Sequence, residues 1–195
     1  MKISTLCVYC GSSTGRRPAY LHATRELAEL CARRGIRLVY GGGRIGLMGA
    51  LADAALAAGG AVTGVIPQAL AEQELAHEGV TELIVTSSMH ARKQTMAERS
   101  DAFVALPGGI GTLDELFEVW TWTQLGFQGK PCGLLNVDGY FDGLLRFIDH
   151  AVVEGFLQPL HRRIASVATE PEALLAALEA FQPQPHAKWL PSSSI

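Results

Sequence analysis

The chain of 195 residues is long enough for one domain with a sizeable hydrophobic core. Apolar residues make up 48% of it and charged residues 18%, the ordinary balance of a soluble globular protein. The formal net charge of −3 at pH 7 gives no electrostatic reason to bind nucleic acid or an anionic membrane.

The N-terminal residues lack the long apolar region of a signal peptide, and no run of about 18 apolar residues occurs. We therefore expect a cytoplasmic protein whose cysteines (Cys7, Cys10, Cys31 and Cys132) are reduced. Cys7 and Cys10 form a C-x-x-C pair in a strand-like run, where this spacing directs the two side chains to opposite faces. No second cysteine pair has metal-ligand spacing, so we interpret both as small core residues.

Apolar strand-like segments alternate with helix-like segments in chain order. Strands are predicted at 3–9, 36–40, 61–66, 82–86, 102–106, 132–137 and 164–168, and helices at 18–34, 46–58, 89–99, 112–125, 140–154 and 171–181. This alternation predicts an α/β fold in which a mostly parallel central sheet of about seven strands has helices on both faces. We expect one domain over 1–181 and a flexible tail over the Pro- and Ser-rich residues 182–195.

Glycine- or serine-rich turns follow the first, second and fifth predicted strands, with the sequences CGSSTG, GGGRIGLMG and PGGIGT. Ligands of open parallel sheets bind outside the carboxyl ends of the strands, so these turns predict one shared anion-binding rim. Gly41, Gly43 and Gly46 match the dinucleotide fingerprint, but the next strand ends in VIPQAL, without the acidic residue that holds a ribose. This turn is therefore predicted to bind a phosphate or the edge of a nucleotide rather than a nicotinamide cofactor. The remaining alternative is a tight turn that binds no ligand.

The PGGIGT turn lacks both the third glycine of the dinucleotide pattern and the Gly-Lys-Ser/Thr end of a P-loop. It offers bare backbone N–H groups from Gly108 to Thr112 at the positive end of a helix, which suits one phosphate. Thr112 and Glu115 also form a capping-box pattern, in which Glu115 would only return to its own helix start. The local pattern leaves a helix cap and a catalytic carboxylate as alternatives for Glu115.

The helix that carries Glu115 has a predicted apolar stripe of Leu113, Leu116, Phe117 and Trp120. Glu115 projects from nearly the opposite side, with Val119 and Trp122, which indicates a buried or interfacial carboxylate. Val119 and Trp122 would suit a dimer contact. Upstream, Arg92 and Lys93 fall in the first turns of a short helix, where a basic pair is unfavourable for the helix dipole. A bound anion can compensate the positive charge of this pair. The alternative is that Arg92 and Lys93 belong to a solvated, charged face of the helix.

Residues 89–93 and 107–115 match M-H-x-R-K and P-G-G-x-G-T-x-x-E, the paired signatures of the Lonely Guy proteins. These are cytokinin-activating 5′-monophosphate phosphoribohydrolases. VYCGSS, LVYGGGRIGLMG and GVIP also resemble the family, so the similarity covers about residues 3–168. The resemblance implies a Rossmann-like homodimer, with its site near the interface, that hydrolyses N6-modified adenosine 5′-monophosphates, and AMP as well, to free base and ribose 5-phosphate.

The resemblance also implies roles for single residues. Glu115 would lie at the ribose with Arg92 as its catalytic partner. The expected substrate and phosphate contacts are Gly43, Glu74, Lys93, Gly108, Gly109, Ile110, Gly111, Thr112 and Thr121. The chemistry needs no cofactor, and no His, Cys or Asp cluster has metal-ligand spacing.

Two other functions are alternatives to this one. The family has also been labelled lysine decarboxylase, but a pyridoxal enzyme needs a Schiff-base lysine. Of four lysines only Lys93 and Lys130 stand in plausible places, and Lys93 belongs to the basic pair. The main alternative is a nucleotide or molybdenum-cofactor carrier on a similar fold, which would share the phosphate loops but have no need of Glu115 with Arg92.

Overall fold

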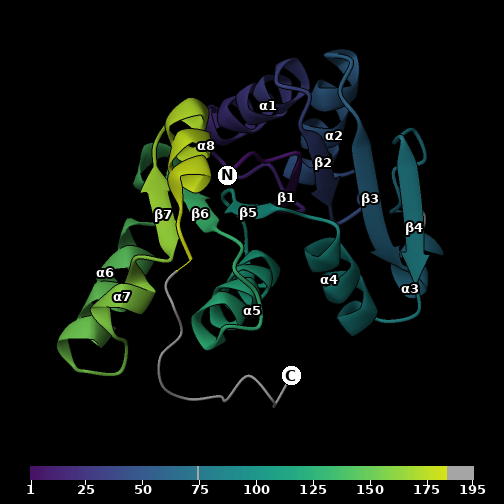
Figure 1. Ribbon diagram of the computed structural model, residues 1–195. Helices are drawn as coiled ribbons and strands as arrows, with labels where there is room; N and C mark the ends of the chain where they lie inside the picture. The colour runs from purple at the N-terminus through teal and green to yellow at the C-terminus, as the bar shows by residue number, and fades with distance from the viewer. Residues whose placement is uncertain (74, 184–195) are drawn as a thin grey trace.

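The computed structural model describes residues 1–73 and 75–183 and contains a sheet of seven strands, all paired in parallel (Figure 1). The strands are β1 (Thr5–Tyr9), β2 (Arg37–Tyr40), β3 (Val62–Pro67), β4 (Glu82–Thr86), β5 (Ala102–Ala105), β6 (Cys132–Leu135) and β7 (Ala165–Ala168), in the spatial order β4-β3-β2-β1-β5-β6-β7. The prediction of a mostly parallel sheet of about seven strands is confirmed.

The six long predicted helices are present as α1 (Pro18–Arg33), α2 (Gly46–Ala57), α4 (Met89–Glu98), α5 (Ile110–Leu125), α6 (Asp142–Val153) and α8 (Pro171–Ala180). Three short elements were not predicted: α3 (Gln68–Ala71), the 3-10 turn η1 (Val137–Gly139) and α7 (Pro159–Arg162). Three or four residues are too few to show a helical period in a sequence.

Two hydrophobic clusters lie on the two faces of the sheet. Helices α1, α2 and α8 contribute to one cluster, and α4, α5 and α6 contribute to the other (Figure 1). Cys10 belongs to the first cluster and Cys7 to the second, so the prediction that these strand cysteines point to opposite faces is confirmed. All four cysteines are free and buried, and burial raises the pKa of the Cys7 thiol to about 12.

The site is positioned by the point at which the strand order reverses. The chain runs outward from β1 to β4 and then returns to place β5 beside β1, so the connections after β1 and β5 leave the sheet in different directions. The Gly11 N–H donates to the Pro107 carbonyl at 3.1 Å, which ties these two turns together. Gly46 (φ +63°), in the turn after β2, lies so close to the turn after β1 that a Cβ on it would be 2.2 Å from the Ser12 carbonyl carbon. The three glycine-rich turns therefore meet in one rim, as the sequence predicts.

Some expectations fall outside the described residues. Glu74 and residues 184–195 of the expected flexible tail are among them. Within residues 1–73 and 75–183, no helix combines the length and the apolar composition needed to cross a membrane.

Candidate active site

A cavity of about 360 Å³ opens at the carboxyl edge of the sheet, over the point where the strand order reverses. The turns after β1, β2 and β5 supply much of its wall as backbone. Its lining residues are Val8, Tyr9, Cys10, Gly11, Ser12, Gly41, Met48, Leu70, Met89, Arg92, Gly109, Ile110, Gly111, Thr112, Asp114 and Glu115. The predicted phosphate turn and the predicted catalytic pair thus line the same cavity, although Gly108 belongs to the adjoining one.

The N-terminus of α5 opens into this cavity. The helix begins at Ile110 with Gly109 as its N-cap, and no described side chain hydrogen-bonds that cap. The first N–H to bond back is that of Leu113, which donates to the Gly109 carbonyl at 3.2 Å. The N–H groups of residues 110–112 belong to the turn that lacks intrahelical partners, and with the positive end of the dipole they suit a phosphate.

Glu115 and Arg92 form a buried ion pair, with each residue 8% exposed. The Arg92 Nη1 lies 2.9 Å from the Glu115 Oε1, but this approach lacks hydrogen-bond geometry, and within the described part of the chain Oε1 has no hydrogen-bond partner. Of the two alternatives left open for Glu115, the structure does not form the capping box, because the helix starts two residues before Thr112 and the carboxylate faces Arg92. Glu115 is thus a buried, charge-paired carboxylate with an unused acceptor.

Backbone carbonyls hold Arg92 in place. Its Nε donates to the Val65 carbonyl at 3.1 Å and its Nη2 to the Gly41 carbonyl at 3.4 Å, so β3 and the residue directly after β2 orient the guanidinium. A Cβ on Gly41 would lie 2.0 Å from Nη2, which makes a side chain at this position incompatible with the observed Arg92. Gly41 was seen in the sequence only as part of the fingerprint, and its place directly after a strand was the available signal.

The environment of Glu115 sets its ionisation. Burial raises the pKa of the Glu115 carboxyl above its ordinary value, and the adjacent Arg92 guanidinium opposes that rise. The result is a carboxylate that ionises at a higher pH than an exposed glutamate, yet remains paired with a cation. This is the combination expected of a group that works by charge or by proton transfer.

Three of the predicted contacts, Lys93, Thr121 and Gly43, do not line the main cavity. The Lys93 Nζ lies 3.2 Å from both the Asp114 Oδ2 and the Glu118 Oε2, and the side chain is 12% exposed. Thr121 is exposed on α5, while Gly43 is buried and pairs with Ala76 in an isolated antiparallel bridge. None of these three predicted residues lines either described cavity.

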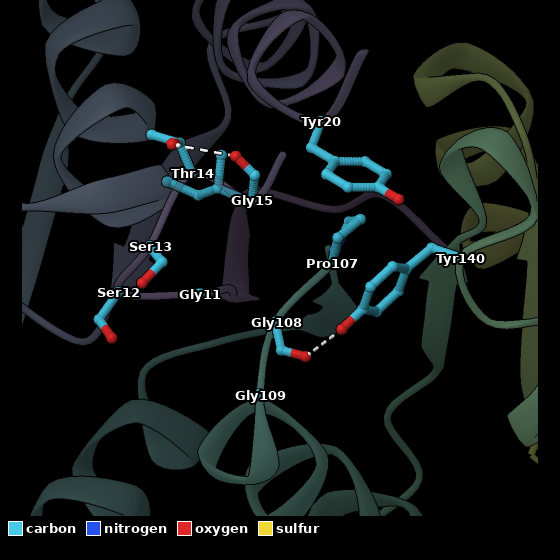
Figure 2. A pocket seen from close by; sticks show the side chains of 11 residues that line it. Gly11, Ser12, Ser13, Thr14, Gly15, Tyr20, Pro107, Gly108, Gly109 and Tyr140 are labelled. Carbon is cyan, nitrogen blue, oxygen red and sulfur yellow. Dashed lines mark hydrogen bonds between the residues drawn. The ribbon is translucent and has the colours of Figure 1, made fainter. Parts of the chain in front are cut away.

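A second cavity of about 300 Å³ adjoins the first, and the two share Gly11, Ser12 and Gly109 in their walls. Figure 2 shows Tyr20 and Tyr140 on one side of it and the turn after β1 on the other. The Tyr140 hydroxyl donates to the Gly108 carbonyl at 2.5 Å, and its ring meets that of Tyr20 edge to face, with 5.5 Å between the centroids. Sequence reasoning missed Tyr140, whose hydroxyl binds the Gly108 carbonyl in the predicted phosphate turn.

The buried face of α5 differs from the predicted apolar stripe. Its buried residues are Thr112, Glu115, Leu116, Val119, Trp120 and Thr123. Phe117 is 38% exposed, whereas Val119 is 2% exposed within this chain and packs in the second cluster, so the suggestion of Val119 as a dimer contact is wrong. The helix is rotated relative to the predicted stripe because it covers the sheet with one flank and the cavity with its first turns.

Solved structures share this architecture. The molybdenum cofactor binding protein from the phototrophic bacterium Rippkaea orientalis superimposes with a TM-score of 0.70 at 25% identity, covering 92% of this chain and 98% of that one. The Moco carrier protein from Chlamydomonas reinhardtii gives a TM-score of 0.67 at 23% identity, covering 91% and 96%. At this identity the latter likeness establishes the fold alone.

The fold and the site define a doubly wound α/β protein whose ligand cavity lies where the strand order reverses. A family profile described as possible lysine decarboxylase matches residues 48–178. The probable cytokinin riboside 5′-monophosphate phosphoribohydrolase LOGL5 of Oryza sativa subsp. japonica is 52% identical over 93% of this chain and 74% of its own length. The cytokinin riboside 5′-monophosphate phosphoribohydrolase LOG5 of Arabidopsis thaliana is 50% identical over 93% and 80%. The chain belongs to this phosphoribohydrolase family, the Lonely Guy family.

Proposed function

We propose that this protein hydrolyses the N-glycosidic bond of cytokinin riboside 5′-monophosphates, which are N6-modified adenosine 5′-monophosphates, and of AMP. The products are the free base and ribose 5-phosphate. The observation that carries the proposal is the buried Arg92–Glu115 pair beside the N-terminus of α5. It occurs in a chain about half identical to named phosphoribohydrolases over more than nine-tenths of its length.

Glu115 acts at the ribose. Breaking the bond between C1′ and the base nitrogen builds positive charge on the sugar ring, and a carboxylate held nearby stabilises that charge. The oxygen of a water molecule bonds to C1′ while the electron pair of the broken bond, with a proton, leaves with the base. The Glu115 carboxylate lines the cavity with its charge paired to Arg92, and it is the group that can orient this water and take its proton.

The phosphate is held by the turn that opens α5. Gly109, Ile110, Gly111 and Thr112 line the cavity with the free N–H groups of a helix start, and Gly108 shapes the turn. A Cβ on Gly108 would lie 2.1 Å from the Thr112 Oγ1, so the threonine hydroxyl is packed against this glycine. Arg92 keeps Glu115 ionised and contributes positive charge at the anionic substrate. In this proposal Thr121, Glu74 and Gly43 are outer contacts of the nucleotide.

The decarboxylase description fits the residues less well. A pyridoxal enzyme needs a lysine free to form a Schiff base. Lys93 is occupied by two carboxylates, and the Lys130 Nζ donates to the Ala97 carbonyl at 2.7 Å. Neither described cavity is lined by a lysine. Among the described residues, no lysine is therefore placed to form a Schiff base with pyridoxal phosphate at this site.

We further propose a homodimer with the site near its interface, working in the cytoplasm. Large apolar side chains are exposed on α5 and α6, which cover the same face of the sheet: Phe117, Leu125, Phe147 and Val153. Light scattering on the protein eluting from a sizing column tests the dimer. We expect the mass of two 20.9-kDa chains, and the mass of one chain at micromolar concentration would contradict it.

The hydrolase proposal is tested with AMP and isopentenyladenosine 5′-monophosphate. Purified protein is incubated with each nucleotide, and free base is followed by chromatography. We expect base from both, with the cytokinin nucleotide preferred. Tight nucleotide binding without release of base from either would instead support a carrier.

A further inference from the structure

The segment of residues 75–77 lies against the glycine turn that follows β2. The His77 N–H donates to the Gly42 carbonyl at 2.9 Å. The Arg44 N–H donates to the Leu75 carbonyl at the same distance of 2.9 Å, and the two bonds frame an isolated antiparallel bridge. Backbone hydrogen bonds to this segment therefore hold the turn in place.

The side chain of His77 ties the segment to α2. Its Nδ1 accepts from the Gly79 N–H at 3.2 Å, so in the neutral imidazole the proton is on Nε2. The Nε2 lies 3.0 Å from the Asp53 Oδ1 and donates to it, and Asp53 belongs to α2, the helix that begins where the turn ends. The His77 side chain is 14% exposed. With a partner on each ring nitrogen, the imidazole is held in one orientation between the segment and the helix.

The position of the turn matters because Gly41 orients Arg92. The Gly41 carbonyl accepts from the Arg92 Nη2 at 3.4 Å, and Gly41 lines the main cavity. Residues 41–43 are all glycine, and Gly42 has a φ of +73°. Glycine has more backbone freedom than any other residue, so the conformation of this turn is set by the groups around it. Residues of β3 pack against Gly42, and the segment that carries His77 supplies the hydrogen bonds.

Resting on the proposed function, we propose that His77 is a positioning residue that holds the glycine turn and, through the turn, the guanidinium of Arg92. His77 lines neither described cavity, so its effect on the reaction passes through the turn. The N–H groups that open α5 lie in a different turn and do not depend on it. Loss of the imidazole should therefore disturb the charge beside Glu115 and lower kcat, while the KM of the nucleotide changes little.

The kinetic test is a double-mutant cycle of His77→Ala and Asp53→Ala, with kcat and KM measured for AMP. We expect each single change to lower kcat by about fivefold to tenfold, with KM within about twofold and Tm within a few degrees of the parent protein. Because the two side chains form one contact, Asp53→Ala should add no more than about a twofold effect in the His77→Ala background. His77→Gln keeps an N–H that can donate to Asp53 and should restore most of the parent kcat.

His22→Ala is the matched control. It removes another histidine that pairs with a carboxylate, that of Glu26 at 3.2 Å, and it lies outside both described cavities. We expect this variant to keep the kcat and KM of the parent protein. Equal fractional losses of kcat from Asp53→Ala in the parent and in the His77→Ala background, or an effect mainly on KM, would overturn the proposal.

A second measurement follows Arg92 without the reaction. Its Nε–H donates to the buried Val65 carbonyl and gives a signal in a proton–nitrogen-15 spectrum that is assigned by its absence in Arg92→Lys. We expect this signal to shift and to exchange faster with water in His77→Ala and in Asp53→Ala, and to stay unchanged in His22→Ala. An unchanged signal in both His77→Ala and Asp53→Ala would overturn the proposal. If the parent protein releases no base, the proposed function fails, whereas the Arg92 signal still tests the role of His77.

Discussion

Replacing Glu115 by glutamine separates the chemical role of this residue from any structural one. The substitution keeps the shape of the side chain and one acceptor oxygen but removes the negative charge. Removing one partner of a buried ion pair commonly costs about 3–5 kcal/mol when the other charge is left uncompensated. In this variant the Arg92 charge is still compensated in part, because its Nε and Nη2 donate to the carbonyls of Val65 and Gly41.

A second effect reduces the expected loss of stability further. The raised pKa of Glu115 shows that burial of its charged form is unfavourable, and a neutral carboxamide avoids that cost. We therefore expect Glu115→Gln to change the free energy of unfolding by about 1 kcal/mol, which for a chain of this size is a Tm change of about 2–4 °C. Catalysis should suffer far more, with a loss in kcat/KM of about 100-fold to 1,000-fold, or about 3–4 kcal/mol of transition-state stabilisation.

The assay pairs base release from AMP with a thermal melt of the same sample. Glu82→Gln is the matched control, because Glu82 pairs with Arg99 at the same 2.9 Å but on the surface, outside both described cavities. We expect this variant to keep full activity and to change stability by less than about 1 kcal/mol. A Glu115→Gln protein that retains activity, or that loses more than about 10 °C in Tm, would refute the reasoning.

Three further predictions concern the same site. Activity should fall as the pH drops through the raised pKa of Glu115. The acid limb of a kcat/KM profile should therefore lie at a higher pH than the pKa range of an exposed glutamate. A limb at or below that range would contradict the role of Glu115. Gly41→Ala should displace Arg92, because the new Cβ would lie 2.0 Å from the Arg92 Nη2. We expect kcat/KM in the base-release assay to fall by about 100-fold. Unchanged kinetics would show that catalysis does not need the guanidinium at its observed position. Tyr140→Phe removes the hydrogen bond to the Gly108 carbonyl. We expect the KM for AMP to rise about fivefold, with kcat nearly unchanged and the Tm within a few degrees of the parent protein. A fall in kcat alone would argue against a role of Tyr140 in holding the proposed phosphate turn.

The architecture could be predicted from the sequence because the strands are apolar and separated by long helix-like segments. The alternation of Cys7 and Cys10 between the two faces also followed from strand geometry alone. The start of α5 could not be located in this way. Thr112 and Glu115 satisfy a capping pattern, yet the helix begins at Ile110 because the preceding glycine adopts an extended conformation and leaves the N–H groups free.

The sequence predicted some of the residues that form the site but not how they are arranged. The glycine turns were expected to meet, because the carboxyl ends of parallel strands share an edge. The pairing of Arg92 with Glu115 joins two helices, and the carbonyls that orient Arg92 come from β3 and from the residue after β2, so no local period in the sequence reveals these contacts. Lys93 shows the limit most clearly, because its adjacency to Arg92 suggested a shared ligand and the fold gives it separate carboxylate partners.

The central claim is that this cavity adds water across the glycosidic bond of a nucleotide. It is tested most directly by incubating the protein with isopentenyladenosine 5′-monophosphate in water enriched in oxygen-18 and analysing both products by mass spectrometry at early times. We expect free base and ribose 5-phosphate in equal amounts from the parent protein and neither product from the Glu115→Gln protein. Because C1 of a free sugar exchanges its oxygen with water, the label is read within the first turnovers, with unlabelled ribose 5-phosphate in the same water as the control. Base released without equimolar ribose 5-phosphate, or ribose 5-phosphate whose label does not exceed that control, would contradict the account.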